Sequence, residues 1–510
     1  MKKNLIARLF TLVVLVACMA SCSEKSSEYT NVIPADASAV VAIHFQSLVD
    51  KSGVSNDDKQ KLIDAMKGEL NAATFQHVEK IIKDGSASGL SIKDPVYFFT
   101  SSLIPSAAVV MKVSDMDKLN KTFEVMASEQ ISDPVTKIDG YYLVKIKGAS
   151  VCAFNESTLL ITEERNSDKI VADLMKQTKD ESIAKSAYFQ SMAKKKGEIT
   201  FFSTMDALPS MYKRQMDMTL GSMDNIDPKD IGVAGGLNFE KGKIALHFEA
   251  VSENEKVKEM FKKQNDISGK LSEAFLANFP SSTLMYMSVN VNGEKLYDML
   301  QENKDFREGL SLDKAEKVKA IFGSFKGDIS GGLINVTMSD MPTFAAYAEA
   351  KNGAALEALY EAKGDLGLRR SEDIVKLGDN EYVYKSRQMN VFFGYKDNYM
   401  YATNDELLYK NIGKKEDKSL KEAAYASNMK GKHQYVVIDM KAILDLPAVK
   451  MLSAMGGKEA ARYIDMASKV SYFEVIGEGN NQSNINLWLV DKDTNSLKQI
   501  IDLAKQYAGI

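Results

Sequence analysis

The chain has 510 residues, of which 45% are hydrophobic and 26% charged, which is the balance of a folded globular protein. This balance excludes an intrinsically disordered, collagenous or polytopic membrane protein, and the nine prolines exclude long proline-rich linkers. The formal net charge of −4 indicates no basic surface for nucleic acid, and the length allows about two to four domains.

Residues 1–21 are predicted to be a lipoprotein signal peptide. Lys2, Lys3 and Arg8 make its start positive, and a run of apolar residues follows over 9–17. Because a membrane-spanning helix needs about 20 apolar residues, this run is too short to span a bilayer. It fits the apolar region of a secretory signal.

A short stretch of small residues then leads to a cysteine. Residues 19–22 (MASC) resemble a bacterial lipobox, in which the cysteine is lipidated and becomes the new N-terminus. Cys18 ends a competing lipobox, but it still lies in the apolar stretch, so we predict that Cys22 carries the lipid. Residues 22–31 would form a polar tether. The alternative is an ordinary cleaved signal peptide with incidental cysteines.

The lipid would make the attachment lasting. Each buried methylene contributes about 0.8 kcal/mol, so one acyl chain binds marginally while the three chains of a mature bacterial lipoprotein hold firmly. Cleavage before Cys22 removes three basic residues and no acidic one, which takes the formal net charge from −4 to −7. We expect a protein anchored to the outer membrane, on its periplasmic face or at the cell surface. Glu24 and Glu28 resemble a thin version of the export signal of surface lipoproteins, so the leaflet stays open.

The third cysteine is expected to be inert. Cys152 lies in the apolar run 151–154 (VCAF) and has no basic neighbour in the sequence to lower its pKa. Once Cys22 is lipidated, a single remaining thiol cannot form an internal disulfide. We predict a buried strand cysteine.

The rest of the chain repeats itself. Five blocks recur in the same order at spacings of 225 to 246 residues: 34–45 with 280–291, 113–116 with 338–341, 151–162 with 391–402, 187–192 with 424–429 and 243–248 with 484–489. We interpret this as an internal duplication, with repeat 1 over 32–263 and repeat 2 over 277–510. The alternative is two similar domains that share generic strand and helix patterns.

Each repeat is predicted to be an antiparallel sheet with helices packed on it. The first repeat has strand-like runs at 39–46, 96–100, 107–113, 141–147, 150–154, 158–162, 198–205 and 243–251. Many of their connections are short, and parallel neighbours would need crossovers of about a dozen residues. Helical patterns follow Ser114 and Asn254 as N-caps and also cover 56–69 and 166–176. The fold class is therefore α+β, with two tandem related repeats after the signal peptide.

Motifs for chemistry are nearly absent. The four histidines are in no metal-binding spacing, so we predict neither a metal nor a cofactor; they are His44, His77, His247 and His433. The loop 85–89 (GSASG) misses the spacing of a nucleophile elbow, and 456–458 (GGK) lacks the upstream glycine of a P-loop. Acidic pairs such as 163–164 are interpreted as solvated loops or caps. The 26 methionines are expected to pack in the core, with a methionine-rich binding surface as the alternative.

Three segments carry a resemblance to a known family. The lipobox, residues 29–37 (YTNVIPADA) and residues 89–97 (GLSIKDPVY) resemble a Bacteroidetes lipoprotein family, domain of unknown function 4836. The resemblance would cover nearly the whole mature chain. It implies an envelope lipoprotein of uncertain role and brings no catalytic residues that could be carried over.

These patterns predict a non-catalytic binding or structural module of the cell envelope. Its partners would be the membrane, through the lipid on Cys22, and an envelope protein or glycan, with a groove between the duplicated halves as the expected binding site. The rival hypothesis is an envelope hydrolase whose dispersed carboxylates, or a Ser/His/Asp cluster, converge after folding. The sequence leaves the ligand, the leaflet and the oligomeric state open.

Overall fold

A computed structural model describes residues 28–104, 106–148, 150–163, 168–208, 226–302, 304–309, 312–337, 341–365, 367–416 and 418–508. The predicted signal peptide, Cys18, Cys22 and most of the 22–31 tether lie outside these residues. The chain forms two compact units. Of the described residues, unit 1 comprises 28–208, 227–253 and 493–508, and unit 2 comprises Ile226 and 254–492.

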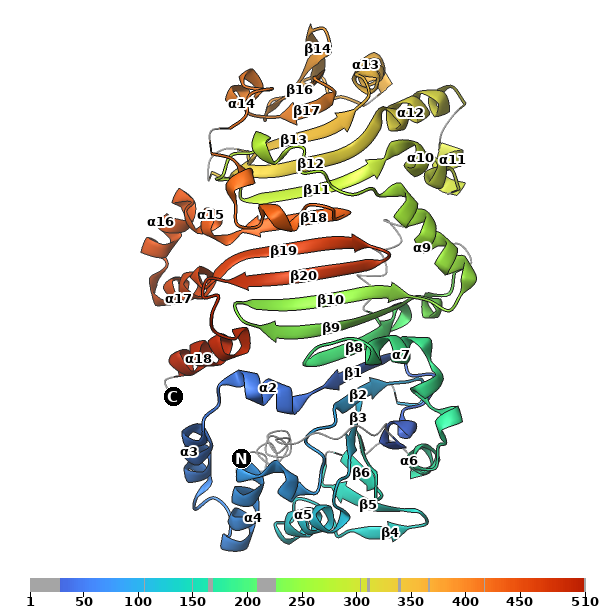
Figure 1. The fold of residues 1–510 in the computed structure, drawn as a ribbon, viewed down its shortest axis with the longest axis vertical. Helices are drawn as coiled ribbons and strands as arrows, with labels where there is room; N and C mark the ends of the chain where they lie inside the picture. The colour runs from blue at the N-terminus through green and yellow to red at the C-terminus, as the bar shows by residue number, and fades with distance from the viewer. Residues whose placement is uncertain are drawn as a thin grey trace. The chain divides into compact units, whose positions relative to one another are not determined.

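Unit 1 is built on an antiparallel sheet, as predicted. Its described strands are β1 Ala39–Ile43, β2 Val96–Thr100, β3 Ala108–Lys112, β4 Thr136–Ile138, β5 Tyr141–Ile146, β6 Ser150–Phe154, β7 Thr158–Glu163, β8 Ile199–Thr204, β9 Gly232–Glu240 and β10 Lys243–Val251. Hydrogen-bonded neighbours follow the order β4-β5-β6-β7-β3-β2-β1-β8-β9-β10 (Figure 1). Every one of these pairs is antiparallel, so hairpins and helical insertions connect them.

The helices of unit 1 lie mainly between the strands. They are η1 Glu28–Val32, α2 Phe45–Ser52, α3 Asn56–Met66, α4 Ala72–Lys83, η2 Gly85–Ser88, α5 Met116–Ser128, α6 Asp168–Met175, η3 Lys179–Glu181, η4 Ile183–Lys185, α7 Ala187–Ala193, η5 Met205–Ala207, η6 Pro228–Asp230 and α18 Ser496–Ala508. The C-terminal helix α18 belongs to this unit, where Lys505 forms an ion pair of 2.9 Å with Asp58 of α3.

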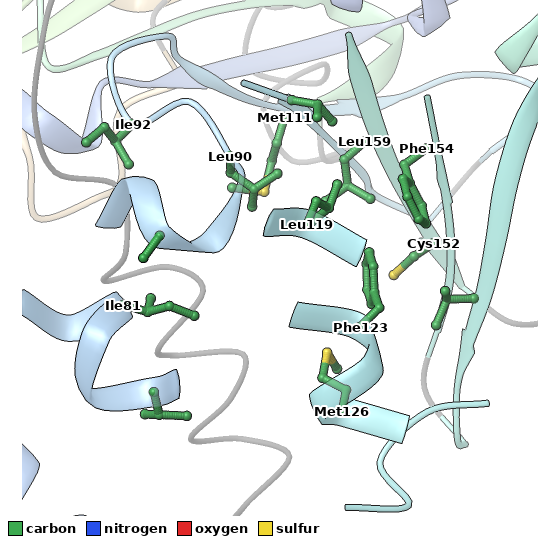
Figure 2. Close-up of a cluster of buried hydrophobic side chains, with 14 of the residues drawn as sticks. Ile81, Leu90, Ile92, Met111, Leu119, Phe123, Met126, Cys152, Phe154 and Leu159 are labelled. Atoms are coloured by element: carbon green, nitrogen blue, oxygen red, sulfur yellow. The ribbon is translucent and has the colours of Figure 1, made fainter. Parts of the chain in front are cut away.

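A hydrophobic cluster joins α5 to the sheet of unit 1 (Figure 2). Leu119, Phe123 and Met126 recur at spacings of four and three, which places them on one face of α5, and all three are buried. The Phe123 ring stacks on Phe154 of β6 at 5.1 Å between ring centroids. Burying each such side chain contributes about 1.5–3 kcal/mol, which is sufficient to fix the helix on the strands. The cap of α5 is Asp115, one residue after the predicted Ser114.

Unit 2 is likewise built on antiparallel strands. Its described strands are β11 Met285–Asn292, β12 Phe325–Asn335, β13 Thr343–Ala350, β14 Asp373–Gly378, β15 Glu381–Lys385, β16 Asn390–Lys396, β17 Tyr399–Thr403, β18 Gln434–Asp439, β19 Val470–Gly479 and β20 Gln482–Leu489. Their order is β14-β15-β16-β17-β13-β12-β11-β18-β19-β20, again antiparallel throughout (Figure 1). Numbered from its own first strand, unit 2 thus has the strand order of unit 1.

The helices of unit 2 also occupy the connections between strands. They are α9 Glu255–Ile267, η7 Leu276–Asn278, α10 Gly293–Glu302, α11 Lys304–Gly309, α12 Leu312–Ser324, α13 Ala354–Glu361, η8 Lys363–Asp365, α14 Glu406–Lys410, η9 Leu420–Glu422, η10 Ala426–Asn428, α15 Met440–Leu444, α16 Pro447–Met455 and α17 Gly457–Ser468. Asn254 caps α9, as predicted, and α9 belongs to unit 2. The compact units therefore differ from the predicted repeats, 32–263 and 277–510, in the placement of α9 and α18.

One of the five sequence blocks joins positions that are not equivalent. Residues 113–116 directly follow β3, whereas 338–341 lie between β12 and β13, and 338–340 are outside the described residues. The third strand of unit 2 therefore begins after this block instead of ending before it. Its spacing of 225 was also the outlier among the five.

Within the described part of the chain, no helix has both the length and the apolar character needed to cross a bilayer.

Candidate functional site

The four histidines do not form a common site. Burial lowers the pKa of His44, His77 and His247, which favours neutral imidazoles in the fold. His77 Nε2 lies 3.1 Å from the hydroxyl of Thr122, a structural contact between α4 and α5. The described residues contain no group of three or more His, Cys, Asp or Glu side chains that could hold a metal ion.

His433 makes the contact that comes nearest to a catalytic arrangement. Its Nδ1 lies 2.7 Å from Oγ of Ser268 and 3.1 Å from the carbonyl oxygen of the same residue. If Nδ1 carries the proton, it donates to Ser268 and cannot act as a base toward the hydroxyl. The ring also packs on Gly479, where an added Cβ would come within 2.7 Å of Nε2. The pair thus joins the end of α9 to the start of β18.

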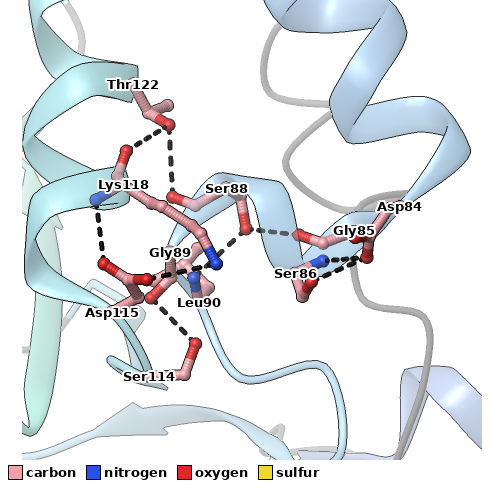
Figure 3. Close-up of polar contacts among 10 residues, drawn as sticks. All are labelled: Asp84, Gly85, Ser86, Ser88, Gly89, Leu90, Ser114, Asp115, Lys118 and Thr122. Carbon is pink, nitrogen blue, oxygen red and sulfur yellow. Dashed lines mark hydrogen bonds and ion pairs between the residues drawn. The ribbon is translucent and has the colours of Figure 1, made fainter.

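The 85–89 loop has a structural role, which Figure 3 shows. Ser88 Oγ donates to the carbonyl of Gly85 at 2.7 Å, and Thr122 Oγ1 of α5 donates to the carbonyl of Ser88 at 3.1 Å. Gly89 has φ +85°, and a Cβ there would lie 2.3 Å from the backbone nitrogen of Leu119. The loop therefore needs glycine because its backbone approaches the first turn of α5 closely.

Unit 1 holds a buried carboxylate beside β8. Glu198 is 5% exposed and accepts hydrogen bonds from Lys51 Nζ at 2.6 Å, Ser47 Oγ at 3.0 Å and the Phe239 N–H at 2.8 Å. Burial alone would raise the pKa of Glu198, but these donors outweigh it and hold the pKa below its ordinary value. The carboxylate links α2, β8 and β9.

Unit 2 holds a different buried carboxylate, in the middle of β19. Glu474 is 1% exposed and lacks a cationic hydrogen-bond partner in the contacts of the described residues. Its Oε2 accepts from Tyr435 Oη at 2.8 Å and Asn428 Nδ2 at 3.0 Å. Its Oε1 accepts from Asn486 Nδ2 at 2.9 Å and Trp488 Nε1 at 2.8 Å. Four neutral donors therefore surround the buried carboxylate.

Aromatic rings and one lysine enclose this cluster. The rings of Tyr472 and Trp488 stack at 5.7 Å, and Lys492 Nζ lies 4.8 Å from the Trp488 centroid and 5.5 Å from that of Tyr472. Burial raises the pKa of Tyr472 to about 12 and, together with Glu474, raises that of Tyr435 further. Burial lowers the pKa of Lys492 against the attraction of Glu474. Both carboxylate oxygens of this polar cluster accept hydrogen bonds, and the lysine makes cation–π contacts with the two neighbouring rings.

A third buried acid holds the segment that precedes β11 in unit 2. Asp328 is 1% exposed, and its Oδ2 accepts from the N–H and the hydroxyl of Ser272, each at 2.9 Å. Its Oδ1 accepts from Asn290 Nδ2 at 2.7 Å. The carboxylate ties the segment before β11 to β12.

Comparison with known proteins identifies the family. A family model described as domain of unknown function DUF4836 matches residues 29–497. The chain belongs to this family. No curated protein matches it. Among solved structures, crystal forms III, I and IV of TP0453 are similar over 45%, 48% and 48% of this chain and 97%, 87% and 98% of theirs, at 9%, 10% and 9% identity. Their TM-scores of 0.23, 0.24 and 0.23 are too low to carry an argument about fold or function.

The thiol of this DUF4836 chain lies where the sequence predicted it. Cys152 is in β6, free and 1% exposed. Burial raises its pKa to about 12, so the thiolate is scarce at neutral pH. Cys22, the predicted lipid attachment site, lies outside the described residues, and Glu164 of the predicted acidic pair does as well.

The methionines divide between the core and the surface. Seven described methionines are buried: Met66, Met111, Met126, Met192, Met205, Met400 and Met429. Five described methionines are exposed: Met287, Met341, Met451, Met455 and Met466. Sequence reasoning did not find the Glu474 cluster, because its donors come from three separate segments. The one available signal was Tyr472, Glu474 and Ile476 alternating on one strand face.

Proposed function

We propose that this chain is an outer-membrane lipoprotein of Bacteroidetes type, cleaved after residue 21 and anchored through lipid on Cys22. In this proposal it is a non-catalytic binding or structural module of the cell envelope. Its body is two tandem repeats that arose by duplication. The partner class is an envelope protein or glycan.

One observation carries the duplication. Ten described strands in each unit pair in the same order, including the distant return of the eighth strand to the first. Val40 of β1 pairs with Phe99 and Phe202, and Tyr286 of β11 pairs with Gly332 and Val437. Generic hairpin formation does not produce such a long-range arrangement twice, because each unit must choose it among many antiparallel orders.

The anchor rests on the leader. The positive start, the short apolar run and the small residues before Cys22 together form the pattern of a lipoprotein signal. A body without a bilayer-crossing helix among its described residues is compatible with attachment by lipid.

The non-catalytic role rests on how the buried acids are used. Glu198, Asp328 and Glu474 are each saturated by donors that hold strands and helices together. A general acid or base must be free to exchange its proton with a substrate. These three carboxylates are instead engaged in structural hydrogen bonds.

The hydrolase remains the second candidate, and the observation in its favour is the 2.7 Å contact of Ser268 with His433. Ser268→Ala would abolish activity toward activated esters if this pair were catalytic. We expect the purified wild-type and variant proteins to give the same background rate.

Metabolic labelling tests the anchor. Cells fed a clickable palmitate analogue should label the wild-type protein, and Cys22→Ala should abolish the label and release the body from the membrane fraction. Cys18→Ala is the matched control and should leave labelling intact. Labelling that persists in Cys22→Ala and is lost in Cys18→Ala would contradict the assignment.

A further inference from the structure

The exposed apolar side chains of unit 2 concentrate on two consecutive helices, α16 and α17. Leu452 is 58% exposed, Met455 78% and Tyr463 63%, and Met451 and Met466 are exposed as well. Thirteen large hydrophobic residues are exposed in the described chain, and these five fall within sixteen positions. Scattered apolar residues are normal on a protein surface, whereas such a concentration marks an interaction site.

The helices themselves are built as a surface element. None of the described residues of α16 or α17 is buried. Only Lys450 and Ser453 interrupt the apolar sequence of α16. Met451, Leu452 and Met455 lie on one face of this helix, because residues three and four apart are neighbours on a helix surface. Figure 1 shows both helices beyond the ends of β18 and β19.

The segment that carries this apolar face has a net positive charge. Residues 440–469 carry five basic and three acidic side chains, a formal charge of +2 in a chain of net charge −4. Lys450 pairs with Asp445 at 3.1 Å and Lys469 with Asp465 at 3.3 Å, and both pairs are solvent-exposed. A helix with apolar residues on one face and Lys or Arg beside them is typical of segments that lie in a membrane interface.

We propose that the α16–α17 pair docks onto the surface of an anionic lipid bilayer. Met451, Leu452 and Met455 enter the boundary between headgroups and acyl chains, and Lys450 and Lys458 meet the lipid phosphates. Complementary charge favours this occupant over a second copy of the chain, because a twofold contact would bring two segments of charge +2 together. The contact is independent of the lipid on Cys22.

Vesicle flotation tests the proposal with the chain produced from Ser23 onward, which has no lipid and keeps every described element. The protein should float with vesicles of 70% phosphatidylcholine and 30% phosphatidylglycerol. It should bind pure phosphatidylcholine vesicles more weakly. Added salt should reduce the difference in binding between the anionic and the neutral vesicles, because salt screens the attraction to the anionic headgroups. Leu452→Ser combined with Met455→Ser should lower the partition coefficient about tenfold or more, because two large side chains no longer enter the lipid.

The matched control is Leu377→Ser combined with Leu407→Ser, which removes two exposed leucines of the same unit from outside these helices. It should leave flotation unchanged. Wild-type protein that fails to float, or a Leu452/Met455 variant that floats like the wild type, would overturn the proposal. A concentration-dependent dimer that the same variant dissociates would also overturn it, because the occupant would then be a second copy. Since the protein used has no Cys22, failure here leaves the anchor proposal standing.

Discussion

Units 1 and 2 share a strand order and fill the same positions with different side chains. In unit 1, Val40 of β1 pairs with Phe99 of β2. In unit 2, the corresponding pair is Tyr286 of β11 and Gly332 of β12. The large ring is on the second strand in unit 1 and on the first strand in unit 2, and the smaller residue is on the other strand in each unit. The same strand pairing thus accommodates different side chains, because a large residue on one strand faces a small residue on the next and the core stays filled.

The segment before the first strand also differs between the two units. Phe279, which precedes β11, is fully buried and packs edge-on against Tyr286 at 5.0 Å. A Cβ on Gly332 would come within 2.6 Å of the Phe279 ring. Unit 1 has Ile33 at the matching place before its first strand, also fully buried. A smaller side chain there leaves room for the ring of Phe99.

The next strands show a difference in chemistry. The row that begins at Val40 continues through Phe202 to Ala234 in β9. The row that begins at Tyr286 continues through Val437 to Glu474 in β19. Unit 2 therefore has a buried carboxylate with four donors where unit 1 has a methyl group. The carboxylate of unit 2 depends on donors from several side chains, since a lone buried charge is unstable.

The largest expected effect comes from removing this carboxylate. Glu474→Ala removes the acceptor of the buried donors of Tyr435 and Asn486 and of the half-buried donors of Asn428 and Trp488, and it should cost about 4 kcal/mol. Urea denaturation, followed by the fluorescence of the only tryptophan, measures the loss. Glu474→Gln keeps one acceptor oxygen and should cost less. Equal stability of the alanine variant and the wild type would show that the network is absent.

The exchanged volumes give the second effect. Gly332→Phe should overfill the space beside Phe279 and lower the free energy of unfolding by about 3 kcal/mol. Urea denaturation measures this loss. Adding Tyr286→Val and Phe279→Ile gives unit 2 the arrangement of unit 1 and should restore at least half of the loss, because the three positions are coupled.

Gly331→Ala is the matched control for that series. A Cβ at Gly331 meets only Met287 at an ordinary 3.7 Å, so its cost should stay near 1 kcal/mol or below. Additive losses in the triple variant would refute the equivalence of the two rows.

The stability contribution of the buried Glu198 in unit 1 should depend on pH, whereas that of a surface ion pair should be small. The folded-state pKa of Glu198 is below its ordinary value of 4.5, so its contribution is present at neutral pH and is lost as pH falls through the folded-state pKa. Glu198→Gln should cost about 2 kcal/mol at pH 7 and much less at pH 3. Glu79→Gln, in an exposed pair with Lys83, should change stability by less than about 0.5 kcal/mol. A cost at Glu198 that is constant with pH would contradict the ion pair.

The smallest effect concerns reactivity and leaves stability unchanged. Cys152 should react with a thiol reagent at neutral pH many times more slowly than the free amino acid, and urea should restore the rate. Rapid labelling of the folded protein would mean that β6 is open to solvent.

Local patterns predicted most strands and the antiparallel pairing, because short connections permit little else. The sequence missed β9, whose Gly232, Gly235 and Gly236 weaken the strand signal. It also matched 113–116 with 338–341, since turn residues recur without being equivalent. The Glu474 cluster could not be predicted, because Asn428 and Trp488 meet that carboxylate only through the strand order. Long-range pairing is the information that a local pattern lacks.

An experimentally determined structure of the chain from Ser23 onward tests the central claim most directly. Superposing the ten strands of unit 1 on those of unit 2 should align all of them in one order, with Val40 on Tyr286 and Ala234 on Glu474. A different strand order in either unit, or a shift of register between these rows, would contradict the account.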